Sequence, residues 1–454
     1  SGKRSVRIKS RHRARSTGPG RNRIGTVHAQ SVNLNQRKSL CRLLSVVPLF
    51  SDSTKLGPMH FRDHWQLNPD IDFLNHGSFG ACPSIVLQTQ RELIDQLERD
   101  PIRFLAPERD LEPKLDEVRQ LIGQLVNAPT SDVAFVRNAT DGVNAVLSSF
   151  PFNPLDEILI TNHGYNACNN AAHHAAKLTG AKVAVAEVPF PLHSNAEVLD
   201  AIERQLNSRT RVLLIDHVTS PTGLIFPIED IIALAHDRGV QVLVDGAHAA
   251  GMLPLNLSTM AADYYTANHH KWLCAPKSSG FLYVQPDLQH QVRPSVISHG
   301  ANQTRPHRSR FITEFDWAGT FDPTPILALK TAIEFLRSLY PGGLTELYRC
   351  NHEKTISARN LLCDALQIAP PCADNMIGSL ASIPLTLSQL DRHSTANLSA
   401  TEQLQHTLVN EHRFELPVYQ LASPDQCCLR ISMQAYNDIS QVDRLAKVMA
   451  RFVN

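Results

Sequence analysis

The hydrophobic pattern of the chain changes from helical spacing to an alternation of helices and short apolar runs. In residues 84–99 and 109–126, apolar side chains recur at intervals of three and four, as on one face of a helix. Further on, helical segments alternate with runs such as VLLID and VLVD, which are apolar up to their final residue. Such runs are typical of parallel strands that are covered by helices on both faces. The pattern therefore predicts an α/β fold with a mostly parallel sheet.

The pattern changes again after Pro323. A long helix is expected at 325–339, then a helix-rich segment, and the stretches ELPVYQL and CCLRISMQAYN near the C-terminus predict strands. A chain of 454 residues is long enough for two packed domains. We therefore expect a basic extension at 1–57, a large domain at 58–325 and a smaller α+β domain at 326–454.

The first fifty residues differ in composition from the rest. They contain twelve Lys or Arg and no Asp or Glu, whereas residues 51–454 hold 32 basic and 43 acidic side chains. Without apolar periodicity, this extension is expected to be disordered. A nucleic-acid-binding arm and a transit peptide are alternatives to an extension without function, which we favour. The acidic excess elsewhere argues against a nucleic-acid surface, and no apolar run is long enough to span a membrane.

The cysteines indicate the compartment. The nine of them show no C-x-x-C pair and no metal-ligand spacing, so no metal site is expected. An odd number in a chain of this size indicates reduced thiols. We therefore predict a cytoplasmic location.

An aspartate and a lysine carry the clearest chemical signal, in VDGAHAAGMLPLNLSTMAADYYTANHHKWLCAPKSSG. Asp245 ends one predicted strand, and Lys271 follows the next strand 26 residues later. Ligands of open α/β sheets bind at the carboxyl ends of strands, so both side chains are expected in one crevice. Pyridoxal 5′-phosphate (PLP) needs an amine for its aldehyde and a carboxylate facing its pyridine nitrogen. Such pairs are common, and only the surrounding residues make this one specific.

This stretch resembles class V of the PLP-dependent aminotransferase family, in which D-x-A-H or D-x-A-Q is followed by H-K after the next strand. The chain is most similar to the isopenicillin N epimerase-like branch, which also contains cysteine desulfhydrases and C–S lyases. The similarity spans roughly residues 70–450. It implies the PLP-dependent transferase fold of type I, with a large domain built on a mostly parallel sheet and a smaller α+β C-terminal domain.

The resemblance assigns roles to residues around the lysine. Lys271 matches the lysine that holds PLP as a Schiff base, and Asp245 matches the partner of the pyridine nitrogen. His248 matches the contact to the hydroxyl edge of the cofactor. Ser220, in HVTSPTG, falls where sulfur-mobilising relatives have an Asn against the same oxygen. For the histidines, an ordinary structural role is the alternative.

A second group is expected at the cofactor phosphate. The segment RNATDGVNAV begins an amphipathic helix, whose free N–H groups and dipole favour an anion. Asn138, Ala139 and Thr140 resemble the phosphate cradle of the family, and Asn268 and His270 match phosphate-side residues. A plain helix cap is the alternative for the first group.

The substrate side comes from distant segments. Tyr165 aligns with the residue that stacks on the pyridine ring, with His163 as a competitor. Arg430 matches the arginine that binds the substrate α-carboxylate, for which a guanidinium fork is suited. Asn75 falls where the family's N-terminal segment reaches the substrate. The alternatives are a turn asparagine and a surface arginine.

Thr320, in WAGTFDPTP, matches a segment that the neighbouring subunit donates to the phosphate. The resemblance thus implies a homodimer with shared active sites that acts on a small amino-acid substrate.

The reaction is left open. An amino-acid epimerase is the first expectation, and a cysteine desulfhydrase or C–S lyase and a class V aminotransferase are the alternatives. Desulfurases carry a nucleophilic cysteine where this chain reads ATEQLQHTLVNEH, so a persulfide relay is disfavoured. Cys372 is too far upstream and is expected to be a buried, inert thiol. A regulator or scaffold is disfavoured because it would have no use for Lys271 and Asp245.

Overall fold

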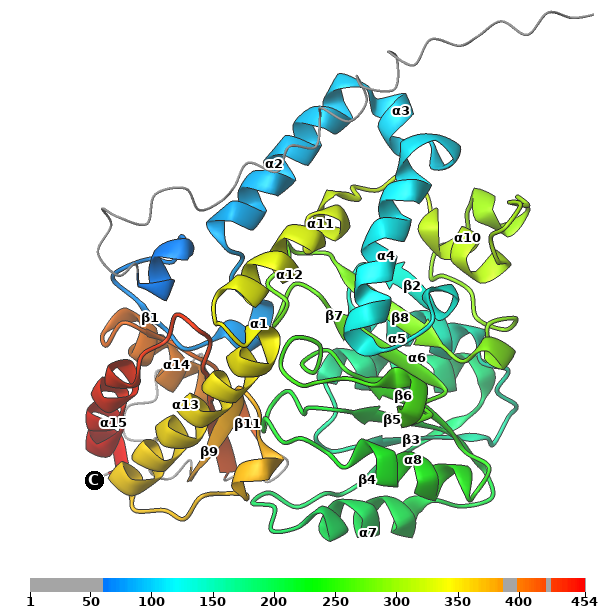
Figure 1. Ribbon diagram of the computed structural model, residues 1–454. Helices are drawn as coiled ribbons and strands as arrows, with labels where there is room; N and C mark the ends of the chain where they lie inside the picture. Colours follow the sequence, from blue (N-terminus) through cyan, green and yellow to red (C-terminus); the bar gives the residue numbers. More distant parts are fainter. Residues whose placement is uncertain (1–59, 387–397, 422–425, 454) are drawn as a thin grey trace, which may run out of the picture. The chain divides into compact units, whose positions relative to one another are not determined.

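The computed structural model describes residues 60–386, 398–421 and 426–453 (Figure 1). The chain divides into two units, Ser1–Pro58 and Met59–Asn454, and all described residues belong to the second. The predicted basic extension at 1–57 lies outside the described residues. The predicted boundary near residue 325 between a large and a small domain stays a prediction.

A seven-stranded sheet forms the centre of the fold, in the order β2-β8-β7-β6-β5-β3-β4. The strands are β2 (Val133–Val136), β3 (Glu157–Thr161), β4 (Lys182–Ala186), β5 (Thr210–Asp216), β6 (Gln241–Asp245), β7 (Tyr264–Asn268) and β8 (Gly280–Val284). Only β8 runs antiparallel to its neighbours, β2 and β7. The predicted, mostly parallel sheet is therefore confirmed.

Helices cover both faces of this sheet (Figure 1). They include α4 (Glu112–Val126), α5 (Ala139–Ser149), α6 (Asn166–Thr179), α7 (Asn195–Gln205), α8 (Ile228–His236), α9 (Leu257–Met260) and α10 (Arg310–Asp316). Helices α2 (Ser84–Arg99) and α3 (Pro101–Leu105) instead project away from the sheet. The helix predicted at 84–99 has the predicted bounds. The one predicted at 109–126 begins at Glu112, because a π-helical turn, Pro107–Leu111, precedes it.

Each strand of the sheet faces two separate hydrophobic cores. In β2, Val133 and Phe135 pack in the core that contains α4, α7 and α8, whereas Ala134 and Val136 pack in the core that contains α5 and α6. Successive strand residues point to opposite faces, so both sets must be apolar. This explains the runs without polar alternation.

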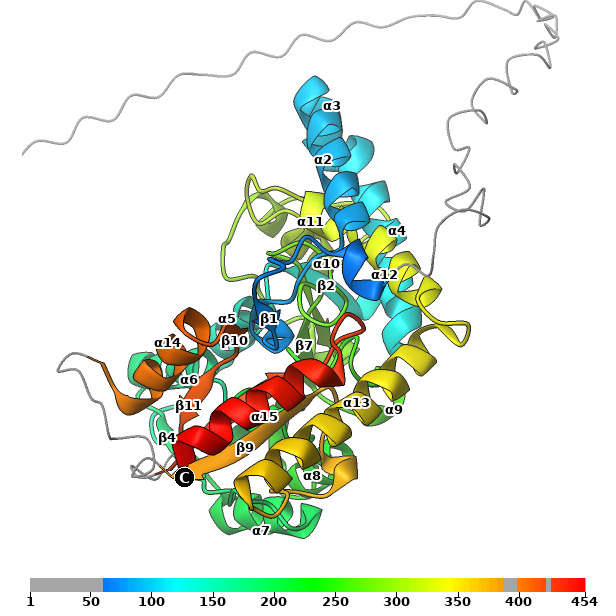
Figure 2. The ribbon, with the colours of Figure 1, turned by 90° about the vertical axis from the view of Figure 1, so that its left-hand side faces the viewer.

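The C-terminal part contains a second, antiparallel sheet in the order β11-β12-β9. Its elements are α11 (Thr324–Leu327), α12 (Leu329–Ser338), α13 (Gly343–Leu366), β9 (Leu380–Thr386), α14 (Ala400–Asn410), β10 (Phe414–Glu415), β11 (Val418–Gln420), β12 (Gln426–Ser432) and α15 (Ile439–Val453). Figure 2 shows α13 and α15 packed side by side. The predicted C-terminal strands are confirmed, whereas the single helix predicted at 325–339 is wrong, because Ala328 separates α11 from α12.

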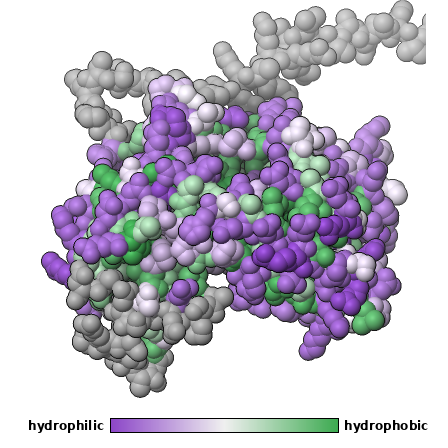
Figure 3. All heavy atoms as spheres, turned by 90° about the horizontal axis from the view of Figure 1, so that it is seen from below, coloured by the Kyte–Doolittle hydropathy of each residue, from purple (hydrophilic) through white to green (hydrophobic). Residues whose placement is uncertain are grey.

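The segment before α2 joins the two parts. Its strand β1 (Asp72–Phe73) pairs with β10, and the one-turn helix α1 (His76–Phe79) follows. The face drawn in Figure 3 is mostly hydrophilic, with scattered apolar side chains. Among the described residues, no helix is long and apolar enough to cross a membrane.

Candidate active site

The candidate site lies at the carboxyl ends of the neighbouring parallel strands β6 and β7. Asp245 is the last residue of β6, and Lys271 lies three residues beyond the end of β7. Both side chains are buried, and the carboxylate of Asp245 acts on the amine of Lys271. The structure therefore brings the two residues together.

The amine of Lys271 is enclosed by side chains. Its Nζ lies 3.1 Å from Nε2 of His248 and 5.9 Å from the centre of the Tyr165 ring. Burial lowers the pKa of Lys271 to about 8, although the negative charge of Asp245 opposes this shift. About a tenth of the amine is therefore uncharged at pH 7, and this is the form that a nucleophile or a base requires.

His248 is a neutral partner of this amine. Burial lowers its pKa well below the usual range, and the charge of Lys271 lowers it further. The indole Nε1–H of Trp272 donates to its Nδ1 at 3.4 Å. The remaining ring proton is then on Nε2, which faces the amine of Lys271.

The carboxylate of Asp245 is held by two donors. The backbone N–H of Ala247 donates to Oδ1 at 2.9 Å, and the thiol of Cys168 donates to Oδ2 at 3.1 Å. Burial, followed by the charge of Asp245, raises the pKa of Cys168 well above the usual range, so the thiol keeps its proton. Asp245 is thereby oriented on the side of the sheet that carries α6.

The first turn of α5 lies against the end of β7. Asn138 is the N-cap, and its Oδ1 accepts from the N–H of Asp141 at 2.9 Å. Asn268 Oδ1 accepts from the N–H of Ala139 at 2.9 Å, which ties the helix start to the strand. Thr140, the next residue of the turn, faces the thiol of Cys168. The helix N-terminus, a favourable place for an anion, thus lies beside the lysine loop.

His270 precedes Lys271 in that loop. It is buried, and its Nδ1 lies 3.2 Å from the carbonyl oxygen of Ser279, to which it donates. Burial lowers its pKa to about 4, and the charge of Lys271 acts in the same direction. His270 is therefore neutral at physiological pH, and its Nε2 is available as a hydrogen-bond acceptor.

The two aromatic candidates occupy different environments. His163 is buried, with Nδ1 at 2.7 Å from Thr222 Oγ1 and Nε2 at 3.1 Å from the carbonyl oxygen of Val188. Tyr165 is the N-cap of α6, and its side chain is 42% exposed beside Lys271. The contacts of His163 are those of a structural residue, so the geometry favours Tyr165 as the stacking ring.

Arg430, on β12, is a buried cation whose contacts are all uncharged. It donates to the carbonyl oxygen of Ser220 at 2.6 Å, to Ser78 Oγ at 3.0 Å and to Asn75 Oδ1 at 3.4 Å. Within the described residues it forms no ion pair, and its Nε has no hydrogen-bond partner among them. A buried guanidinium without a carboxylate is unfavourable, so a carboxylate ligand would supply the missing partner.

The segment around α1 is fastened to the lysine loop. His76 Nε2 lies 3.0 Å from the carbonyl oxygen of Lys271. Gly80 has a φ of +71°, and a Cβ there would lie 2.1 Å from the carbonyl oxygen of His270. Only glycine fits this approach. Asn75, at the start of α1, is consequently held close to Arg430.

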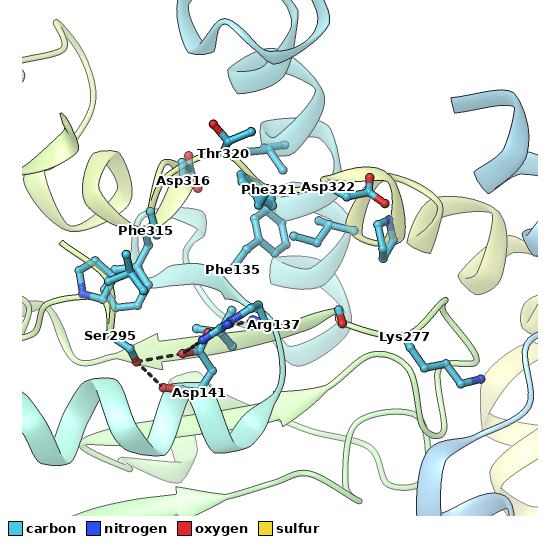
Figure 4. Close-up of a pocket in the computed structure, with 18 of the residues that line it drawn as sticks. Phe135, Arg137, Asp141, Lys277, Ser295, Phe315, Asp316, Thr320, Phe321 and Asp322 are labelled. Atoms are coloured by element: carbon cyan, nitrogen blue, oxygen red, sulfur yellow. Dashed lines mark hydrogen bonds and ion pairs between the residues drawn. The ribbon is translucent and has the colours of Figure 1, made fainter. Parts of the chain in front are cut away.

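Thr320 lies apart from this cluster. It is exposed between α10 and α11, on the wall of a cavity of about 580 Å³ that Arg137, Asp141 and Lys277 also line (Figure 4). The structure gives it no contact with Lys271, and its expected action across a subunit interface stays a prediction.

Three residues of the cluster were not predicted from the sequence: Ser78, Cys168 and Trp272. Ser78 lies three residues after Asn75 and Trp272 directly after Lys271, so their positions were a usable signal. The contact of Cys168 with Asp245 depends on how α6 packs on the sheet, and no sequence pattern marks it. Cys372 is buried, as expected.

The donor set fits PLP: a buried amine, a fixed carboxylate on the neighbouring strand, a helix N-terminus and a buried cation that lacks a carboxylate. These features define a PLP-dependent enzyme of fold type I. The model of the aminotransferase class-V family matches residues 83–445, and the chain belongs to this family.

Similar proteins differ in their reactions. The chain is 31% identical over 402 residues to the isopenicillin N epimerase of Amycolatopsis lactamdurans, covering 86% of this chain and 96% of that protein. It is 30% identical over 406 residues to a probable chloroplastic L-cysteine desulfhydrase of Arabidopsis thaliana, covering 83% and 82%. A mutant of C-DES with glycine covalently linked to its PLP cofactor has a similar fold. Its TM-score is 0.70 at 21% identity, over 86% of this chain and 98% of that one.

Proposed function

We propose that this PLP-dependent enzyme acts at the α-carbon of an amino acid, with Lys271 as the residue that binds the cofactor and moves the α-proton. The observation that carries the proposal is the buried amine of Lys271, whose pKa is lowered to about 8 and which faces Asp245. PLP, when bound, withdraws electrons from the bonds at the substrate α-carbon. Asp245 would keep a proton on the pyridine nitrogen.

The other residues would hold the reactants. The first turn of α5 and the side-chain amide of Asn268 would bind the phosphate, with His270 beside them, and His248 and Ser220 would contact the hydroxyl edge. Tyr165 would pack on the ring. Arg430 would pair with the substrate α-carboxylate, which supplies the charge that this buried cation lacks.

Epimerisation is our first candidate for the reaction. It is supported by the relative from A. lactamdurans, which is matched over 96% of its length. C–S bond cleavage is the second candidate, supported by the desulfhydrase of A. thaliana at nearly equal identity. The segment where desulfurases carry a nucleophilic cysteine is helix α14, which contains none. This supports chemistry without a persulfide relay.

Incubation in D₂O with a panel of L- and D-amino acids separates the candidates. An epimerase introduces deuterium at the α-carbon and yields both enantiomers. A C–S lyase releases sulfide, or a persulfide from cystine, together with pyruvate and ammonia. If the PLP-loaded protein shows neither exchange nor release with any member of the panel, the proposed activity is wrong.

We also propose a homodimer, because the matched position of Thr320 in the family implies a contribution from the neighbouring subunit. A cytoplasmic location is proposed from the cysteine pattern. The chloroplastic name of the plant relative makes an organelle the alternative.

A further inference from the structure

Asp216 ends β5 as Asp245 ends β6. The two strands are parallel, and the two aspartates are register partners. In both strands the residue before the aspartate belongs to the core with α7 and α8, and the one before that to the core with α5 and α6. Strand alternation therefore points both aspartates toward α5 and α6. Two buried carboxyl groups, 4% and 2% exposed, lie side by side.

The carboxyl group of Asp216 faces two backbone N–H groups, those of Tyr165 and Ser220. Tyr165 begins α6, and Ser220 lies in the loop after β5. Both loops carry residues of the candidate active site, and the backbone of Ser220 also contacts Arg430. One buried side chain thus connects the loop of the stacking ring with the loop that contacts the substrate-binding arginine.

The charged and titratable groups around Asp216 come from every neighbouring element: Asp245 on β6, Cys168 on α6 and Lys271 after β7. Burial raises the pKa of Asp216 well above the usual range, and the charge of Asp245 raises it further. The two N–H groups and Lys271 oppose this shift without cancelling it. Two adjacent buried carboxyl groups do not both ionise at neutral pH.

We propose that Asp216 is a positioning residue of the PLP site: a neutral carboxyl group that orients the loops of Tyr165 and Ser220 and leaves Asp245 as the single carboxylate facing the cofactor. This proposal rests on the PLP function proposed above. It places the one proton held by the two carboxyl groups on Asp216. Asp245 already accepts a hydrogen bond from the thiol of Cys168 and would also face the protonated pyridine nitrogen.

Infrared difference spectra of the cofactor-free protein at neutral pH test the protonation directly. Wild type minus Asp216→Asn should show the carbonyl band of a protonated carboxylic acid. The matched control is Asp316→Asn, because Asp316 is equally buried but pairs with Arg119 at 2.7 Å and with Arg308 at 2.8 Å. That control should show carboxylate bands instead. Carboxylate bands alone for Asp216→Asn would overturn the proposal.

Stability against denaturant provides a second readout without cofactor. A carboxyl group with a raised pKa in the folded state holds a proton that the unfolded chain loses above its ordinary pKa, so its contribution to stability falls as pH rises. Asp216→Asn removes this loss. Its denaturation midpoint should therefore rise relative to that of the wild type as the pH is raised from about 5 to about 9. Asp316→Asn should be less stable than the wild type throughout. A gap between Asp216→Asn and wild type that does not change with pH would contradict a neutral Asp216.

The positioning role is tested by PLP binding. Asn keeps an acceptor oxygen for the two N–H groups, whereas Ala keeps none. The PLP dissociation constant of Asp216→Ala should exceed that of Asp216→Asn at least tenfold, and equal values would overturn positioning. If Asp216→Ala does not fold, the infrared comparison still decides the protonation. If the proposed PLP function is wrong, borohydride reduction will leave no PLP adduct on Lys271, while the infrared difference will be unchanged.

Discussion

The cofactor half of the candidate site and its substrate half are built differently. The cofactor half comes mainly from β6, β7 and the start of α5, and its aspartate, histidines and lysine are buried, each with a hydrogen-bond partner within the protein. The substrate half combines Asn75, Tyr165 and Arg430 from three distant segments, and it leaves Tyr165 half-exposed and one nitrogen of Arg430 unpartnered. The first half is preorganised for one cofactor, whereas the second leaves groups for a ligand to satisfy.

The comparison predicts that the largest loss follows from removing the amine of the cofactor half. Lys271→Ala should lower kcat by at least about 10³-fold, since it removes both the covalent attachment and the base. After borohydride reduction, mass spectrometry should find PLP on Lys271 in the wild type and none in the variant. Lys277→Ala is the matched control and should keep the adduct, because Lys277 donates to the carbonyl oxygen of Gly80 instead. An adduct on Lys277 in the wild type would contradict the assignment.

In the substrate half, Arg430→Ala should act on substrate binding more than on cofactor binding. Loss of charged hydrogen bonds worth about 1.5–3 kcal/mol each should raise KM by at least about tenfold. Arg430→Lys should recover only part of the loss, because an ammonium cannot form a bidentate pair with a carboxylate. Steady-state kinetics and PLP absorbance measure the two effects. If Arg430→Ala and Arg430→Lys weaken PLP binding as much as they weaken substrate binding, the two halves are not separable.

Thr320 tests whether the cofactor half is complete within one chain. Thr320→Ala should weaken PLP retention by about 1–3 kcal/mol if a phosphate hydrogen bond is lost. If the threonine acts across the interface, heterodimers of Thr320→Ala and Lys271→Ala chains have one fully active site, in which the intact lysine of one chain meets the intact threonine of the other. Mixed dimers in which no site recovers, or an active monomer in sedimentation, would show that Thr320 does not act across an interface.

The smallest expected effect is that of pH on the lysine of the cofactor half. The pKa of Lys271 is lowered from 10.5 to about 8, and the uncharged amine is the reactive form. The rate of PLP attachment to the cofactor-free protein should therefore rise up to about tenfold per pH unit below pH 8 and level off above it. Stopped-flow absorbance measures this rate. A rate independent of pH between about 6 and 9 would contradict the shift.

The sequence predicts the cofactor half better than the substrate half, for a physical reason. Asp245 and Lys271 follow consecutive strands, and parallel strands present their carboxyl ends on one edge. Asp216 ends the apolar run VLLID in the same manner, so the same argument could have found it. The contacts of Asn75 and Ser78 with Arg430 join residues more than 350 positions apart, and only packing reveals them.

Two differences in the fold also have local causes. Strand β9 contains Pro384 and was not predicted, yet it is an edge strand of its sheet, where proline is tolerated. The interruption at Ala328 leaves the helical spacing of apolar residues nearly unchanged, so periodicity alone does not reveal that two helices replace one.

The two cores on either side of the central sheet limit how this protein can change its length during evolution. A one-residue insertion within β6 would shift the register of the residues after it, and successive strand residues face opposite sides of the sheet. Asp245 would then face the core that Val244 now faces, and Val244 would face the active site. Insertions and deletions in β5 and β6 are therefore expected to be selected against unless they come in pairs, whereas the loops on the far edge of the sheet are free to vary. Among homologues, strand lengths before the two aspartates should differ by even numbers only.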